Sequence, residues 1–158
     1  MPAAAAGLEN WAKKLAGKSI AVKASPRIGS VYESRFVVET KHLIPFADAE
    51  MPAVLSTPAL IGELERTARE AVADLLEPHE RTVGVEVQVL HLAPSLPGFT
   101  VVCRARVLRV EQDEITYQVE ASDEQDLLAR GLHRRRVVDV RRLRRRVEKK
   151  QRPTGPAG

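Results

Sequence analysis

Two ionisable side chains of this sequence fall on surfaces that are otherwise apolar, and their types suit acid–base chemistry. In residues 83–93, VGVEVQVLHLA, alternation predicts a strand whose one face carries His91 together with four valines. Glu65 lies at the edge of a helical stripe formed by apolar residues at positions 61, 64, 68, 72 and 75. A carboxylate and an imidazole on surfaces that become buried need polar partners, and each is the obvious candidate for the other. Such a pair could move protons in general acid–base catalysis.

One long helix and five strands must position these residues. The helix pattern begins with Thr57 as the predicted N-cap, has Pro58 at its first helical position and runs to about Leu76. Strand patterns cover residues 31–40 before the helix and 82–93, 99–110, 114–121 and 127–140 after it. Short turns predict that the last four strands are mainly antiparallel neighbours. This order favours an α+β fold, in which an antiparallel sheet of about five strands wraps around one long central helix.

Composition and charge narrow the class of protein. A chain of 158 residues, 44% hydrophobic and 29% charged, predicts one globular domain, at residues 31–140, after an N-terminal extension at 1–30. The single Cys103 cannot form an intrachain disulfide, so we expect a cytoplasmic protein. The apolar runs are too short for a membrane span, so we expect no membrane association. Zinc-type Cys/His spacing, a phosphate-binding glycine loop and a G-x-S-x-G elbow are all missing from the sequence, so no metal is expected.

The spacing of four residues resembles the fluoroacetyl-CoA thioesterase family of hotdog proteins. That family carries a threonine, a glutamate eight residues later, and then a glycine followed seven residues later by a histidine; here these are Thr57, Glu65, Gly84 and His91. The segment GLHRRRV is similar to the family's Gly-x-His-x-Arg, which places the arginine on Arg135. The resemblance covers about residues 31–140 and implies a hotdog fold that hydrolyses an acyl-CoA thioester.

The resemblance also implies a role for each residue. His91 would be the general base and proton shuttle, Glu65 would orient it or activate water, and Thr57 would position or attack the thioester carbonyl. Gly84 would offer its backbone N–H to the oxyanion, and Arg135 would help to hold the substrate. The family implies an acyl-CoA substrate, no cofactor, and a homodimer or dimer of dimers with sites near the subunit interface.

Two departures from the family and one geometric constraint refine this hypothesis. Asp48 and Met51 stand where the family's best-known member has lid phenylalanines, so we expect a small or medium acyl group rather than fluoroacetyl specificity, with Met51 near the substrate. Pro58 stands where that member has glycine. Because eight helical residues span about 12 Å, Thr57 must lie in the bend before the helix, or the site must draw on a second chain.

Each candidate also has a structural interpretation. His91 could be a core histidine, Glu65 a helix-edge carboxylate, Thr57 only an N-cap and Gly84 a sheet bulge. Arg135 competes with its two arginine neighbours, and the strand register decides which of them faces inward. The three other histidines look ordinary; these are His42, His79 and His133.

The C-terminal end is strongly basic and leaves several hypotheses open. Residues 126–158 carry ten arginines and two lysines against three acidic residues. Residues 141–158 predict a basic helix with a flexible tail, which could be merely solvated, could dock the CoA phosphates or could bind nucleic acid. The last is not expected, because aromatic residues for base stacking are scarce. The alternative to an enzyme is therefore a hotdog protein that binds acyl-CoA or nucleic acid through this segment. A hotdog hydratase is not expected either, because residues 41–65 contain no aspartate followed five residues later by a histidine.

Overall fold

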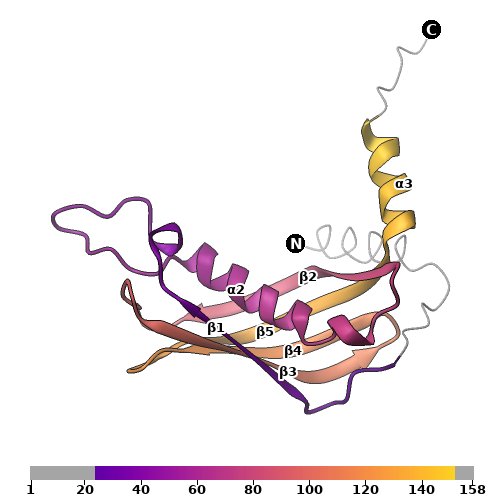
Figure 1. Cartoon of the computed structure of the whole chain (residues 1–158), viewed down its shortest axis with the longest axis horizontal. Helices are drawn as coiled ribbons and strands as arrows, with labels where there is room; N and C mark the ends of the chain where they lie inside the picture. Colours follow the sequence, from indigo (N-terminus) through magenta and orange to yellow (C-terminus); the bar gives the residue numbers. More distant parts are fainter. Residues whose placement is uncertain (1–23, 152–158) are drawn as a thin grey trace, which may run out of the picture.

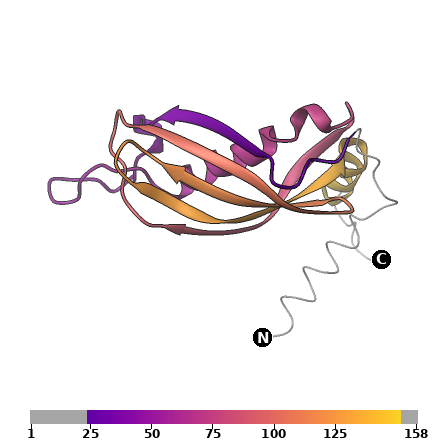
Figure 2. The same ribbon diagram turned by 90° about the horizontal axis from the view of Figure 1, so that it is seen from below.

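The computed structural model describes residues 24–151, so residues 1–23 of the predicted extension and residues 152–158 of the predicted tail lie outside it. One main helix and five strands form the body. The elements are β1 (Val31–Val37), η1 (Thr40–His42), α2 (Thr57–Glu70), η2 (Ala73–Leu75), β2 (Glu80–His91), β3 (Thr100–Glu111), β4 (Glu114–Ser122), β5 (Leu127–Asp139) and α3 (Val140–Gln151). The predicted α+β architecture is confirmed: the antiparallel sheet curves around α2 (Figures 1 and 2).

The strand order differs in one respect from the prediction. The sheet runs β1-β3-β4-β5-β2, so β2 pairs with β5 and not with β3, which follows it in sequence. Residues 92–99 link these two strands, and eight residues are long enough to cross the width of the two strands between them. As a result β2 is an edge strand, paired on one side only among the described strands.

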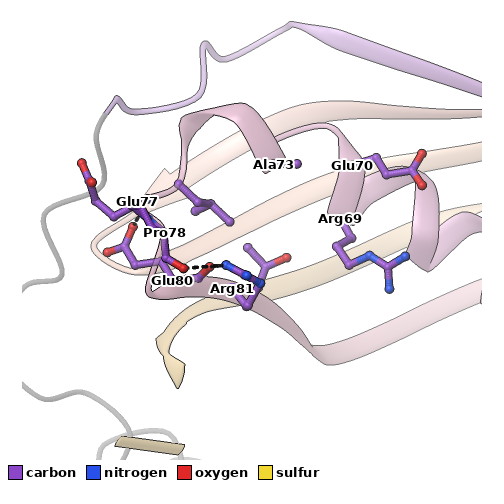
Figure 3. Close-up of a pocket in the computed structure, with 9 residues that line it drawn as sticks. Arg69, Glu70, Ala73, Glu77, Pro78, Glu80 and Arg81 are labelled. Atoms are coloured by element: carbon purple, nitrogen blue, oxygen red, sulfur yellow. Dashed lines mark hydrogen bonds between the residues drawn. The ribbon is translucent and has the colours of Figure 1, made fainter. Parts of the chain in front are cut away.

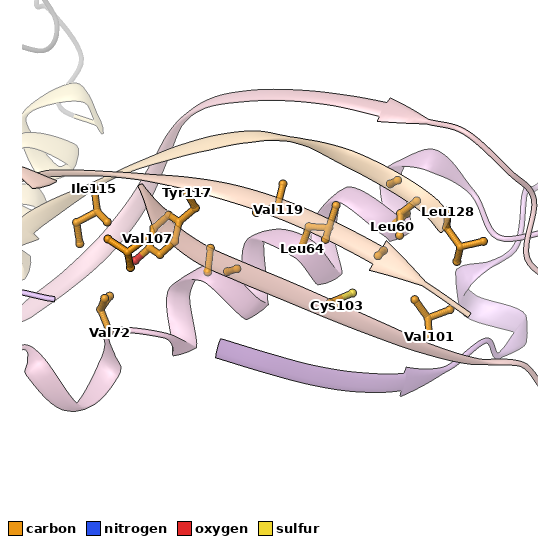
Figure 4. Close-up of a cluster of buried hydrophobic side chains, with 14 of the residues drawn as sticks. Leu60, Leu64, Val72, Val101, Cys103, Val107, Ile115, Tyr117, Val119 and Leu128 are labelled. Atoms are coloured by element: carbon orange, nitrogen blue, oxygen red, sulfur yellow. The ribbon is translucent and has the colours of Figure 1, made fainter. Parts of the chain in front are cut away.

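The core lies between α2 and the concave face of the sheet (Figure 4). The inward faces predicted for β3 and β4 are confirmed, because every apolar residue on them is at most 3% exposed: Val101, Cys103, Ala105, Val107, Ile115, Tyr117, Val119 and Ala121. From the helix, Leu60, Leu64 and Ala68 complete the same cluster. Burying this much apolar surface fixes the orientation of α2 against the sheet, and thereby the orientation of its polar residues.

Helix α2 starts and stops at residues other than those predicted. Ser56 is its N-cap, with a side chain that accepts a hydrogen bond from the Ala59 amide at 3.3 Å, so that Thr57 becomes the first helical residue. The helix ends at Glu70 rather than near Leu76 because Val72 leaves helical dihedral angles, and the chain then tightens into η2. Capping by Ser56 leaves the Thr57 hydroxyl free for another partner.

Helix α3 follows β5 without a loop and extends away from the sheet (Figure 1). Its first amide, that of Val140, donates to the His79 carbonyl at 2.9 Å, which fixes the base of the helix beside the start of β2. Within the described part of the chain, no helix combines the length and the apolar character needed to cross a bilayer.

Candidate active site

Thr57 and His91 meet where α2 begins and β2 ends. The Thr57 Oγ1 atom lies 2.8 Å from His91 Nδ1, which is hydrogen-bonding distance. The other ring nitrogen of His91, Nε2, is buried and has no hydrogen-bond partner among the described residues. A hydroxyl on one side of an imidazole and a free nitrogen on the other form two thirds of a nucleophile–base–carboxylate arrangement.

Glu65 is not the partner of His91 within the described chain, contrary to the pairing predicted from the sequence. Its Oε1 atom lies 3.6 Å from His133 Nε2 and 3.7 Å from Arg135 Nη1. The reason is the direction of α2, which begins beside His91 and reaches the level of Gly84 when it arrives at Glu65. Seven strand residues separate these two points, and they span about 23 Å. The Glu65 side chain is 41% exposed, at the edge of the predicted stripe.

A bulge in β2 sets the face on which Gly84 lies. Simple alternation predicts that Gly84 and His91 point to opposite faces, but the pairing with β5 shifts between Gly84 and Glu86. This irregularity reverses the alternation, so that Gly84 faces α2 just as His91 does. A Cβ built on Gly84 would lie 2.5 Å from Glu65 Oε1 and 3.2 Å from His133 Cε1. The absence of a side chain at this position is therefore what admits the Glu65 carboxylate.

Arg135 faces the interior, which resolves the choice left open among the three arginines. Arg135 and Arg136 are both 5% exposed, so their partners distinguish them. The Arg135 guanidinium donates from Nε to Thr82 Oγ1 at 3.0 Å and from Nη2 to the Thr82 carbonyl at 2.8 Å. Arg136 forms ion pairs with Asp113 and Glu114 instead. Arg135 and Glu65 thus form a charged pair under the bulge.

His133 belongs to the same cluster, although its sequence context looked ordinary. It is 1% exposed and lies within 3.0 Å of Arg135 Nη1. A signal was available in the sequence, because residues 133 and 135 are two apart on a strand and therefore share a face.

A cavity of about 520 Å³ opens one helical turn beyond Glu65, between the end of α2 and the start of β2 (Figure 3). Its lining is mixed, with Ala73, Leu76 and Pro78 as apolar members and charged residues at 69, 70, 77, 80 and 81. It also includes Thr82, the hydrogen-bond partner of Arg135. The cavity falls within the range of volumes found for small-molecule sites.

Met51 lies apart from this cluster in the described chain. The loop between η1 and α2 protrudes beyond the end of the sheet (Figure 1), and Met51 is 38% exposed on it. The loop is braced by Asp48, whose carboxylate accepts from the Glu50 and Met51 amides at 2.9 and 2.8 Å. These two bonds hold the pKa of Asp48 below its usual value.

Comparisons with known proteins identify the family to which this chain is similar. The family described as fluoroacetyl-CoA-specific thioesterase matches residues 37–141. A fluoroacetyl-CoA thioesterase from Streptantibioticus cattleyicolor is 32% identical over 143 residues, which cover 87% of this chain and 100% of that protein.

Solved structures lead to the same fold. The fluoroacetyl-CoA thioesterase FlK superposes with a TM-score of 0.76 at 30% identity, covering 82% of this chain and 100% of that one. A hot-dog-like protein from Thermanaerovibrio acidaminovorans gives 0.73 at 26% identity, over 79% of this chain and 93% of the other. A thioesterase superfamily member from Thermus thermophilus gives 0.71 at 26% identity, over 80% and 96%. The predicted hotdog fold and the family resemblance are confirmed.

Proposed function

Because the chain belongs to the fluoroacetyl-CoA-specific thioesterase family, we propose that Thr57, His91 and Glu65 carry out its reaction. The chain is an acyl-CoA thioester hydrolase of the hotdog fold. Its substrate, as we propose it, is a small or medium acyl-CoA. The observation that carries the assignment of residues is the 2.8 Å contact between Thr57 Oγ1 and His91 Nδ1, together with the unoccupied Nε2 of His91.

The proposed reaction moves one proton twice. His91 takes the proton from the attacking hydroxyl, which is that of Thr57 or of a water molecule held by Thr57, as a new C–O bond forms at the thioester carbonyl. The carbonyl oxygen becomes negative and is stabilised by backbone N–H donors, among which we propose that of Gly84 of the partner subunit. When the C–S bond breaks, His91 returns the proton to the CoA sulfur. An acyl-Thr57 intermediate would need a second round with water; either route yields carboxylate and CoA thiol, and neither requires a cofactor.

The third member of this set comes, in our proposal, from a second copy of the chain. Among the strands that the structure describes, β2 is paired along one edge only, and it carries exposed apolar residues, since Val87 is 36% and Leu90 68% exposed. Free edges of this kind invite pairing with another strand. Pairing β2 with its own copy about a two-fold axis near Gln88 sets His91 opposite the bulge at Gly84 of the partner subunit.

This register completes the site. Glu65 lies against Gly84 in each chain, so Glu65 of the partner subunit would reach His91 Nε2, which has no hydrogen-bond partner within residues 24–151. A homodimer of this kind would have two equal sites, each with Thr57 and His91 from one chain and Glu65 and Arg135 from the other. The protruding loop with Met51 would then lie over a site shared by the two chains, in agreement with the place that the resemblance gives Met51 near the acyl group.

Part of the substrate would occupy the cavity beyond Glu65. Arg69 and Arg81 line it, and arginine side chains suit the phosphates of CoA.

We also expect a cytoplasmic enzyme, in agreement with a single cysteine, Cys103, that is free and buried.

The function is tested by free-thiol release from a panel of acyl-CoAs that runs from acetyl to long-chain and aromatic groups. Cys103 does not interfere, because burial raises the pKa of its thiol to about 12. We expect turnover on small or medium acyl groups. Absence of thiol release from every thioester of the panel would contradict the proposed substrate and reaction.

Replacing Gly84 with alanine should lower kcat by roughly 10-fold or more, because the added Cβ would fall 2.5 Å from Glu65 Oε1 and displace the carboxylate. The matched control is Gly62→Ala, where a Cβ meets no atom within 4 Å. That variant should keep full activity and gain about 0.5–1 kcal/mol of stability, since alanine favours the helix. Steady-state kinetics and thermal melts of the two variants measure these effects. A Gly84→Ala enzyme as active as wild type would show that Glu65 has no role in the reaction.

A further inference from the structure

His133 occupies the centre of the polar cluster and contacts three groups from three elements. Its Nδ1 atom lies 2.8 Å from the Glu86 carbonyl oxygen of β2. Its Nε2 atom lies 3.0 Å from Arg135 Nη1 on its own strand and 3.6 Å from Glu65 Oε1 on α2. At 1% exposure the ring is screened from bulk water, so these contacts decide its protonation and its orientation.

The partners leave only one assignment of protons to the ring. A carbonyl oxygen can only accept a hydrogen bond, so His133 Nδ1 carries the hydrogen that points to Glu86. A guanidinium can only donate, so His133 Nε2 must offer its lone pair to Arg135. His133 is therefore the neutral Nδ1–H tautomer. In agreement, burial lowers its pKa and the charge on Arg135 lowers it further, while the Glu86 carbonyl and Glu65 oppose these effects in part.

Arg135 is held from two sides as a consequence. Its Nε and Nη2 atoms donate to Thr82, as described above, and its Nη1 atom donates to His133. Nη1 lies 3.7 Å from Glu65 Oε1 and also donates to the Glu65 backbone carbonyl at 3.5 Å, so the 3.0 Å bond to His133 is the shorter of its two hydrogen bonds. Loss of the bond would leave Nη1 with only its long contact to the Glu65 carbonyl, so the planar guanidinium could tilt about its contacts with Thr82. A shift on the order of 1 Å at a catalytic group can cost about 100-fold in rate.

We propose that His133 is a positioning residue of the active site: as a neutral imidazole anchored on the bulge of β2, it holds Arg135 against Glu65. The inference rests on the proposed roles of Glu65 and Arg135 in thioester hydrolysis. His133 does not touch the substrate in this arrangement. It acts through Arg135, in the way that outer hydrogen-bond partners orient the groups that do the chemistry.

Two substitutions separate the two bonds of the ring. Asparagine places its amide nitrogen near the position of Nδ1, so His133→Asn keeps a donor for Glu86 and loses the acceptor for Arg135. Glutamine places its amide oxygen near Nε2, so His133→Gln keeps the acceptor for Arg135 and loses the donor for Glu86. Each loses one buried hydrogen bond, so the two melting temperatures should fall by similar amounts.

The proposal predicts different kinetics for these variants. His133→Asn should lower kcat on the order of 10- to 100-fold, whereas His133→Gln should stay within a few-fold of wild type. In an Arg135→Lys background, where the bond to His133 is already lost, His133→Asn should cost less than about 2-fold more. Equal losses of kcat in the Asn and Gln variants, in step with melting temperature, would show a purely structural role and overturn the proposal.

A measurement on the unaltered enzyme keeps the test independent of mutant folding. Nitrogen-15 NMR of the histidine rings should show His133 as the neutral Nδ1–H tautomer at pH 7. A charged ring or the Nε2–H tautomer would contradict the assignment. The proposed function is tested separately. It would be refuted if the wild-type enzyme released no thiol or if the His91→Ala variant kept wild-type activity. The His133 variants are compared only in an enzyme that releases thiol and depends on His91.

Discussion

Replacing His91 with alanine should lower kcat about 100-fold or more, with little change in the affinity for acyl-CoA. The imidazole is the group that hydrogen-bonds the Thr57 hydroxyl, at 2.8 Å, and it is the proposed carrier of the proton to the leaving thiol. Its loss removes an interaction used in the transition state more than in substrate binding, so the change should appear in kcat rather than in KM. Thiol release under saturating acyl-CoA measures it.

The control for this prediction is Thr57→Ser, which keeps the hydroxyl beside His91 and removes only a methyl group. It should retain most of the activity if the hydroxyl is what matters, since serine can accept and donate as threonine does. A His91→Ala enzyme that turns over at the wild-type rate would exclude His91 as the general base. The general base would then have to be Glu65 or a residue of the buried cluster around it.

The sequence was sufficient for most of the fold because the patterns of the core strands and of the buried helix are regular. The alternating faces of β3 and β4 follow directly from burial, and the structure confirms them. The helical stripe is confirmed only in part: Leu64, Ala68 and Val72 are buried, but Leu60 is buried in place of Ile61. The features that could not be predicted depend on contacts between residues far apart in the sequence. The position of β2 beside β5 depends on where residues 92–99 cross, and short-range patterns carry no information on that path.

The candidate site shows the same division between local and non-local information. Strand alternation identified His91 as a candidate and the family resemblance added Thr57. Neither predicted that the two would contact each other, because the contact depends on the direction in which α2 crosses the sheet. The bulge after Gly84 reverses the face of every residue before it, and its effect is invisible to simple alternation. His133 was overlooked although it shares a strand face with Arg135, since its importance depends on the Glu86 carbonyl that the bulge turns toward it.

A mixture of two inactive variants should regain activity if each site is built from two chains. Glu65→Gln and His91→Ala should each lower turnover on the order of 100-fold as homodimers. After subunit exchange, a heterodimer would combine Thr57 and His91 of the Glu65→Gln chain with the intact Glu65 of the other chain. Random exchange makes half of the dimers mixed, and each mixed dimer has one complete site out of two, so about a quarter of wild-type activity should return.

The matched control is a mixture of His91→Ala with Thr57→Val, because both changes fall in the same half of the proposed site. Every mixed dimer of that pair has one site without the imidazole and one without the hydroxyl, so activity should stay at the level of the single variants. A site contained in one chain predicts that neither mixture recovers. The recovery of one mixture alone would thus assign Glu65 to the partner across β2, and would explain why the structure leaves His91 Nε2 without a hydrogen-bond partner among its described residues.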